Sequence, residues 1–156
     1  PAIDTLMDDI DAARAESYPL LMSMRLLGRE PSGDPTAIAD ALVIEEGYKG
    51  LGAHWVEVPR RIAAKIVTHL IAGELAYPNE IVEQGAAEAL TSRFLGFFPQ
   101  GARYFTNGAC SGPFAVYNLV GEEVLGWRSL SEAPFDNGVV VISAERAGMI
   151  WAEDAP

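Results

Sequence analysis

The chain has 156 residues, of which 49% are hydrophobic and 21% charged. This length and composition predict one folded domain spanning residues 1–156 and argue against an intrinsically disordered chain. The 22 acidic residues outnumber the 11 lysines and arginines, which gives a formal net charge of -11. Such a field repels nucleic acid and anionic membranes and attracts a cationic partner, although acidity on its own also serves solubility.

Residues 3–17 carry apolar side chains at helical spacing and predict an amphipathic helix. Residues 20–27 are apolar at almost every position, a pattern that fits a buried helix or a strand. Because leucine and methionine outnumber β-branched residues there, we expect a helix. A loop should follow over residues 29–35. Asp34 and Pro35 are typical of a helix start and predict a helix over residues 36–46.

Residues 47–52 contain three glycines and should end that helix, and residues 54–58 should be extended. The apolar stripe between Arg60 and Gly73 has the width of a helix face that packs on a core. We expect Asn79 to cap a further helix that stops near Phe98. The part of the chain up to about residue 99 is therefore predicted to be mostly helical.

Strands are predicted after Gly101, over residues 103–106 and 114–120, with a turn-forming segment between them. The last quarter of the chain has two runs rich in β-branched and aromatic residues, joined by a short polar connection with a glycine, and predicts an antiparallel hairpin. The sheet part covers about residues 102–154. The predicted class is α+β, with N-terminal helices packed on one face of a C-terminal antiparallel sheet.

No residue set in the chain forms a recognisable catalytic, metal or cofactor site. Cys110 is the one cysteine, and His54 or His69 could pair with it as a base. Because no nucleophile signature surrounds Cys110, we interpret it as an ordinary small residue. One cysteine and two histidines are not a zinc ligand set, and the glycines of residues 47–52 match neither nucleotide-binding fingerprint. We therefore predict a protein that is not an enzyme and needs no cofactor or metal.

The cysteine content also bears on location. A single cysteine excludes an intramolecular disulfide and fits a reducing compartment. The printed sequence starts without the pattern of a secretory leader, and no apolar run approaches the roughly 18 residues of a membrane span. We expect a cytoplasmic protein.

Aromatic residues among acids supply the remaining candidates. Phe135 is expected in the core, whereas Trp127 and Trp151 fit either the core or an exposed binding surface. The hairpin formed by residues 135–142 and 148–154 resembles the close of small bacterial immunity proteins of polymorphic-toxin and type VI secretion systems. These tend to finish with a phenylalanine-aspartate-glycine strand and then a tryptophan-acid-acid strand. Residues 73–77, 94–98 and 104–108 are similar in order and character, so the resemblance covers roughly the second half of the chain.

The resemblance implies a cytoplasmic protein that binds and neutralises a cognate toxin without catalysis. This chain lacks the longer run of terminal acids after Asp154, and no functional residue is carried over from the family. Charge complementarity would favour a toxin with a basic surface. The predicted partner contacts are the acids and tryptophans of the sheet part, namely Glu122, Glu123, Trp127, Glu132, Asp136, Trp151, Glu153 and Asp154.

Two other functions remain open at this stage. A small enzyme that uses carboxylates, with or without a divalent metal, would need several acids to converge in one pocket. An acidic adaptor subunit could instead dock its partner through the helix of residues 3–16. The sequence also leaves open whether the chain forms a homo-oligomer.

Overall fold

The computed structural model describes residues 2–15, 17–27, 34–77, 79–109 and 114–155. Five strands form one antiparallel sheet in the order β1-β5-β4-β3-β2, so the last two strands of the chain occupy its centre. The elements in chain order are α1 (Ala2–Ala13), β1 (Leu21–Leu26), α2 (Pro35–Glu45), η1 (Gly52–His54), β2 (Val56–Val58), α3 (Arg60–Ala72), α4 (Gln84–Leu95), β3 (Arg103–Thr106), β4 (Phe135–Ile142) and β5 (Arg146–Asp154).

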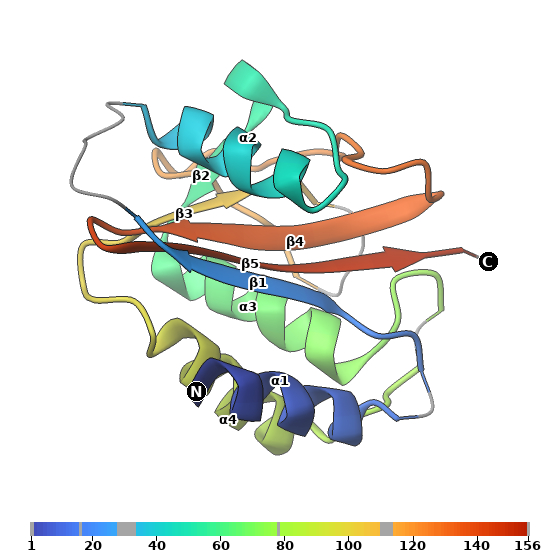
Figure 1. Cartoon of the computed structure of the whole chain (residues 1–156). Helices are drawn as coiled ribbons and strands as arrows, with labels where there is room; N and C mark the ends of the chain where they lie inside the picture. Colours follow the sequence, from blue (N-terminus) through green and yellow to red (C-terminus); the bar gives the residue numbers. More distant parts are fainter. Residues whose placement is uncertain (1, 16, 28–33, 78, 110–113, 156) are drawn as a thin grey trace.

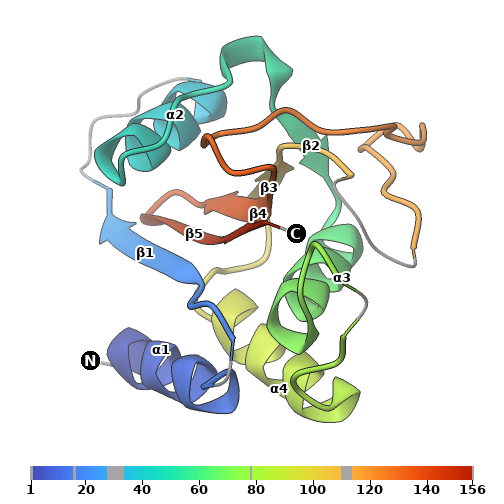
Figure 2. The same cartoon turned by 90° about the vertical axis from the view of Figure 1, so that its right-hand side faces the viewer.

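Helices cover both faces of the sheet (Figures 1 and 2). Helices α1, α3 and α4 lie on one face, and α2 lies on the other. Strand β4 serves both layers because its side chains alternate: Val139 and Val141 join the larger core cluster, and Val140 and Ile142 join the smaller cluster beneath α2. The predicted α+β class is confirmed, but the helices are divided between the two faces.

Several sequence predictions are confirmed closely. The hairpin forms as β4 and β5, and the helices expected over residues 36–46 and 60–73 form as α2 and α3. Asp34 caps α2, since its side chain accepts a hydrogen bond from the backbone N–H of Thr36 at 3.0 Å. Of the residues 54–58 predicted to be extended, Val56–Val58 form β2, whereas His54 is the last residue of η1. Residues 103–106 form β3 as predicted.

Three local predictions are wrong. The expected helix over residues 20–27 is strand β1, because it pairs with β5, more than 100 positions further along the chain. The expected strand over residues 114–120 is a loop with a single bridge between Tyr117 and Glu123. The fourth helix begins at Gln84, later than expected, since the carboxylate of Glu83 rather than Asn79 accepts from the first backbone N–H groups.

A buried arginine joins α1 to α3. Arg14 donates from Nη1 to the carbonyl oxygens of Leu70, Ile71 and Gly73 at 2.7–2.9 Å, and so satisfies the last carbonyls of α3. Burial lowers the pKa of its guanidinium from the usual value. No helix in the described part of the chain is long and apolar enough to cross a membrane.

Candidate partner-binding site

The structure buries two of the eight predicted contact residues. Asp136 and Trp151 are both 0% exposed, so the prediction that they belong to an exposed binding surface is wrong. The reason is their place in the sheet. Asp136 lies on β4 and Trp151 on the neighbouring β5, where both side chains face the layer covered by α2.

The carboxylate of Asp136 accepts five hydrogen bonds. Its Oδ1 accepts from the backbone N–H of Leu130 at 3.1 Å, from Asn107 Nδ2 at 3.0 Å and from Trp151 Nε1 at 3.3 Å. Its Oδ2 accepts from the backbone N–H and the hydroxyl of Ser131 at 3.3 and 3.0 Å. These donors compensate the carboxylate for the contacts with water that it loses on burial.

Asn107 continues this network. Its Nδ2 donates to the carbonyl oxygens of Arg128 and Asp136, both at 2.9 Å, and its Oδ1 accepts from Asn137 Nδ2 at 2.8 Å. We call Asn107, Asp136, Asn137 and Trp151 the Asp136 clamp. Asn107 precedes residues 114–127 in the chain, and Arg128 and Leu130 follow them. The clamp therefore joins the two ends of that segment.

Two glycines allow the clamp to close. Gly108 has a φ of 130°, and a Cβ there would lie 2.8 Å from the Cα of Trp127. The backbone at Trp127 can therefore lie this close to residue 108 only because residue 108 is a glycine. Gly138 lies directly opposite Trp151 in the β4–β5 register. A Cβ on Gly138 would lie 2.6 Å from Cδ2 of the indole, which shows that the ring occupies the space above this glycine.

Residues 114–130, which we call the projecting loop, extend from the sheet past β2 and α3 (Figure 2). Val116 is buried, the backbone N–H of Leu119 donates to the carbonyl of Glu57, and that of Val124 donates to Val116. Asn118 Oδ1 accepts from the backbone N–H groups of Val120 and Glu122 and so stabilises the turn. The loop is therefore held by hydrogen bonds along its length.

The outer side of the projecting loop is apolar with acids beside it. Val120 is 77% and Leu125 85% exposed, and Glu122 and Glu123 between them are also exposed. Five of the eight large hydrophobic side chains exposed in the described chain lie on this loop: Tyr117, Leu119, Val120, Leu125 and Trp127. Concentration on one short segment distinguishes this patch from the scattered apolar residues of an ordinary surface.

Trp127 stands at the base of the loop. Its ring stacks on Phe135 with centroids 6.0 Å apart, and 37% of the residue remains exposed. Phe135 pairs across the hairpin with Asp154, whose carboxylate accepts from the backbone N–H of Ala76 at 2.9 Å. Asp154 therefore binds the segment after α3, and its side chain is only partly exposed to solvent.

Glu132 and Glu153 meet at a hollow of about 480 Å³ on the α2 side of the hairpin. We call it the acidic hollow; its lining is Gly47, Tyr48, Lys49, Leu130, Ser131, Glu132 and Glu153. The Tyr48 ring centroid is 6.4 Å from that of Trp151. Burial raises the pKa of the Tyr48 phenol and the charge of Glu153 raises it further, so the phenol is neutral at neutral pH.

Five of the eight predicted residues thus form two groups instead of one. Glu122, Glu123 and Trp127 lie on the projecting loop, and Glu132 and Glu153 lie at the acidic hollow, which begins where the loop ends at Leu130. The sequence prediction did not include Tyr117, Leu119 and Val120 in the surface, because residues 114–120 were expected to form a strand, and it did not consider Leu125. It also missed Tyr48, which had been assigned only to a segment that ends a helix.

The other candidates from the sequence are not brought together within the described part of the chain. Cys110 lies outside the described residues. His54 lies in η1 and His69 on α3, where burial lowers the pKa of the His69 imidazole. No group of three or more histidine, cysteine or acidic side chains placed to hold a metal ion occurs within the described ranges.

Comparisons with protein-family models, with curated proteins and with solved structures found no match to this chain. The resemblance of the closing hairpin to immunity proteins therefore stays a prediction.

Proposed function

We propose that this protein is an immunity protein that binds and neutralises a cognate bacterial toxin in the cytoplasm, without catalysis. The observation that supports the proposal is a surface in two parts, the projecting loop and the acidic hollow, which follow each other in the chain at Leu130. It combines exposed apolar side chains with four carboxylates that form no ion pair with a described residue: Glu122, Glu123, Glu132 and Glu153.

The two parts of this surface have different roles in the proposal. Leu125, Val120 and Trp127 supply apolar area of the kind that forms the centre of a protein interface, and Glu122 and Glu123 supply a charged rim. The Asp136 clamp and the hydrogen bonds of the loop fix its shape before binding, which reduces the entropy lost on association.

The acidic hollow fits a basic side chain of the partner. Glu132 and Glu153 can accept hydrogen bonds from a lysine or arginine, and the ring of Tyr48 lines the same space. Lys49 also lines the hollow. The hollow therefore has two carboxylates and one ammonium, and its net charge is -1. The overall charge of -11 would accelerate the encounter with a basic toxin.

The test uses the protein encoded by the reading frame next to the gene of this chain, which the proposal expects to be a toxin. The toxin should arrest growth when expressed alone, and co-expression of this protein should restore growth. In surface plasmon resonance, Glu132→Gln with Glu153→Gln should lower the association rate about 10-fold at low salt, with a smaller effect at high salt. Leu125→Ala with Trp127→Ala should instead raise the dissociation rate.

The matched control is Glu80→Gln with Glu88→Gln, which removes two exposed acids outside this surface. These substitutions should change the kinetics little. Failure to rescue growth, or equal loss of binding in the control and the test variants, would contradict the proposal.

A further inference from the structure

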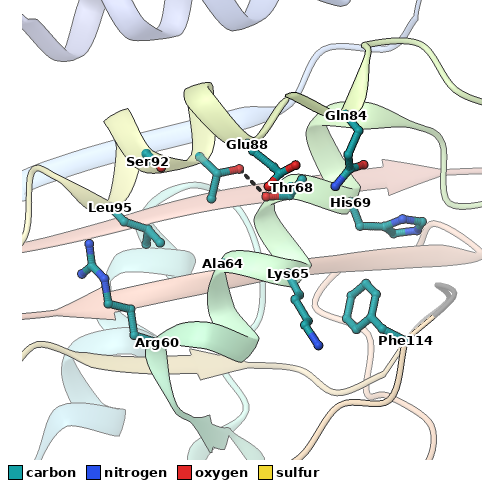
Figure 3. A pocket seen from close by; sticks show the side chains of 11 residues that line it. Arg60, Ala64, Lys65, Thr68, His69, Gln84, Glu88, Ser92, Leu95 and Phe114 are labelled. Carbon is teal, nitrogen blue, oxygen red and sulfur yellow. Dashed lines mark hydrogen bonds between the residues drawn. The ribbon is translucent and has the colours of Figure 1, made fainter. Parts of the chain in front are cut away.

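A groove between α3 and α4 is a further concave feature of the described structure (Figure 3). Its volume is about 570 Å³, within the range of sites for small molecules. Helix α3 contributes Arg60, Lys65 and His69 to one wall, and α4 contributes Gln84 and Glu88 to the other. The groove is separate from the projecting loop's outer side and from the acidic hollow.

Two threonine hydroxyls, those of Thr68 and Thr91, are hydrogen-bonded to each other in the lining of the groove. Thr91 Oγ1 donates to the carbonyl of Ala87 at 2.9 Å, so its proton is used. In the 2.8 Å contact between Thr68 Oγ1 and Thr91 Oγ1, Thr68 must therefore be the donor. Thr68 is left with acceptor capacity only, and it lines the groove.

The two walls carry opposite charges that do not neutralise each other. Neither Lys65 nor Glu88 forms an ion pair with a described residue. Figure 3 shows Lys65 extending from α3 towards Phe114, while Glu88 extends from α4. Arg60, further along the same wall, donates to the Tyr104 hydroxyl at 2.6 Å and keeps its remaining donors.

An apolar lining completes the groove. Phe114, Ala64 and Leu95 contribute it, and the Phe114 ring meets the His69 imidazole edge to face with centroids 5.9 Å apart. A flat ring in a ligand would find both an aromatic neighbour and aliphatic contacts here.

We propose that the α3–α4 groove binds a small zwitterionic molecule of the aromatic amino-acid type. Its carboxylate accepts from Lys65, its ammonium donates to Glu88 and to the free acceptor of Thr68, and its ring contacts the lining around Phe114. Opposite charges on facing walls favour such a dipolar ligand over a simple anion or cation, because each isolated charge would leave one wall unpaired. The inference does not depend on the proposed toxin.

The test is an amide NMR titration of the full chain with three probes that differ by one charged group. L-phenylalanine carries both groups, 3-phenylpropionate lacks the amine, and 2-phenylethylamine lacks the carboxylate. We expect L-phenylalanine to shift the signals of His69 and Phe114 with a Kd of about 0.1–1 mM, as suits an open groove. Each truncated probe should bind about 10-fold more weakly.

Variants assign each group to its wall. Lys65→Gln should weaken L-phenylalanine and 3-phenylpropionate but leave 2-phenylethylamine unchanged, and Glu88→Gln should weaken L-phenylalanine and 2-phenylethylamine but leave 3-phenylpropionate unchanged. Arg61→Gln and Glu80→Gln, exposed neighbours that do not line the groove, serve as controls. Absence of saturable shifts up to about 10 mM L-phenylalanine would overturn the proposal. Equal effects of the four variants would overturn it as well.

Discussion

Acids at one end of the β4–β5 hairpin have opposite environments. Asp136 is buried and accepts five hydrogen bonds, whereas Glu132, four residues earlier in the chain, lies exposed at the rim of the acidic hollow. The two tryptophans divide in the same way: Trp151 is fully buried over Gly138, and Trp127 is partly exposed at the base of the projecting loop.

This difference separates residues that position a surface from residues that form it. Asp136 holds Leu130 and Ser131, and through Asn107 it also holds Arg128, so it fixes where the projecting loop leaves the sheet. The positions of Glu122, Glu123 and Leu125 depend on where the loop leaves the sheet, but these three side chains do not fix that point themselves. The same residue type thus serves stability in one place and is free for recognition in the other.

The largest expected effect separates the tryptophans. Trp151→Ala should lower the free energy of unfolding by about 3–5 kcal/mol, because it empties a packed site next to Tyr48 and Trp55. Trp127→Ala should cost about 1 kcal/mol or less, since that ring has one stacking partner and partial exposure. Urea denaturation of both variants measures the two values, and similar losses would contradict the division.

The second-largest difference in stability is expected between variants of Asp136 and Glu132. Asp136→Ala should cost about 3 kcal/mol, because the donors on Asn107, Leu130 and Ser131 lose their acceptor inside the protein. Asp136→Asn keeps one acceptor oxygen and should lose less. Glu132→Ala should stay within about 0.5 kcal/mol of the parent chain. Hydrogen exchange at residues 114–130 provides a second readout, since only the Asp136 variants should accelerate it.

The smallest effect concerns Tyr48 beside the acidic hollow. Its pKa lies above the usual value of 10.0, mainly through burial and then through the charge of Glu153. The unfolded chain therefore loses this proton first, and the contribution to stability is present below pH 10 and declines as pH rises above that value. Glu153→Gln should lower the Tyr48 pKa partway, as measured by NMR titration of its ring. An unchanged pKa would remove Glu153 from contact with the phenol.

Local pattern was sufficient for several parts of the fold. The α2 start at Asp34 and Pro35, the apolar stripe of α3 and the β4–β5 hairpin all depend on neighbours within a few positions. Strand β1 could not be predicted in this way. Its run of apolar residues fits two conformations, and pairing with β5 decides between them.

The candidate site was only partly predictable for a related reason. The acids and Trp127 near the loop were identified by composition, but the burial of Asp136 depends on donors from two separate segments around residues 107 and 130. No local feature distinguishes its carboxylate from that of Glu132. Exposure of Leu125 and Val120 likewise depends on the whole fold, since no strand in the described part of the chain pairs with these two residues beyond the bridge between Tyr117 and Glu123.

The strand order has a consequence for synthesis on the ribosome. Strands β4 and β5 lie at the middle of the sheet but are translated last, so β1, β2 and β3 have no complete template until residues 135–154 have left the exit tunnel. Most long-range contacts must then form together once these residues have emerged, which favours slow folding over stepwise assembly of the nascent chain. A ribosome-stalled chain ending before Phe135 should remain sensitive to protease and available to chaperones.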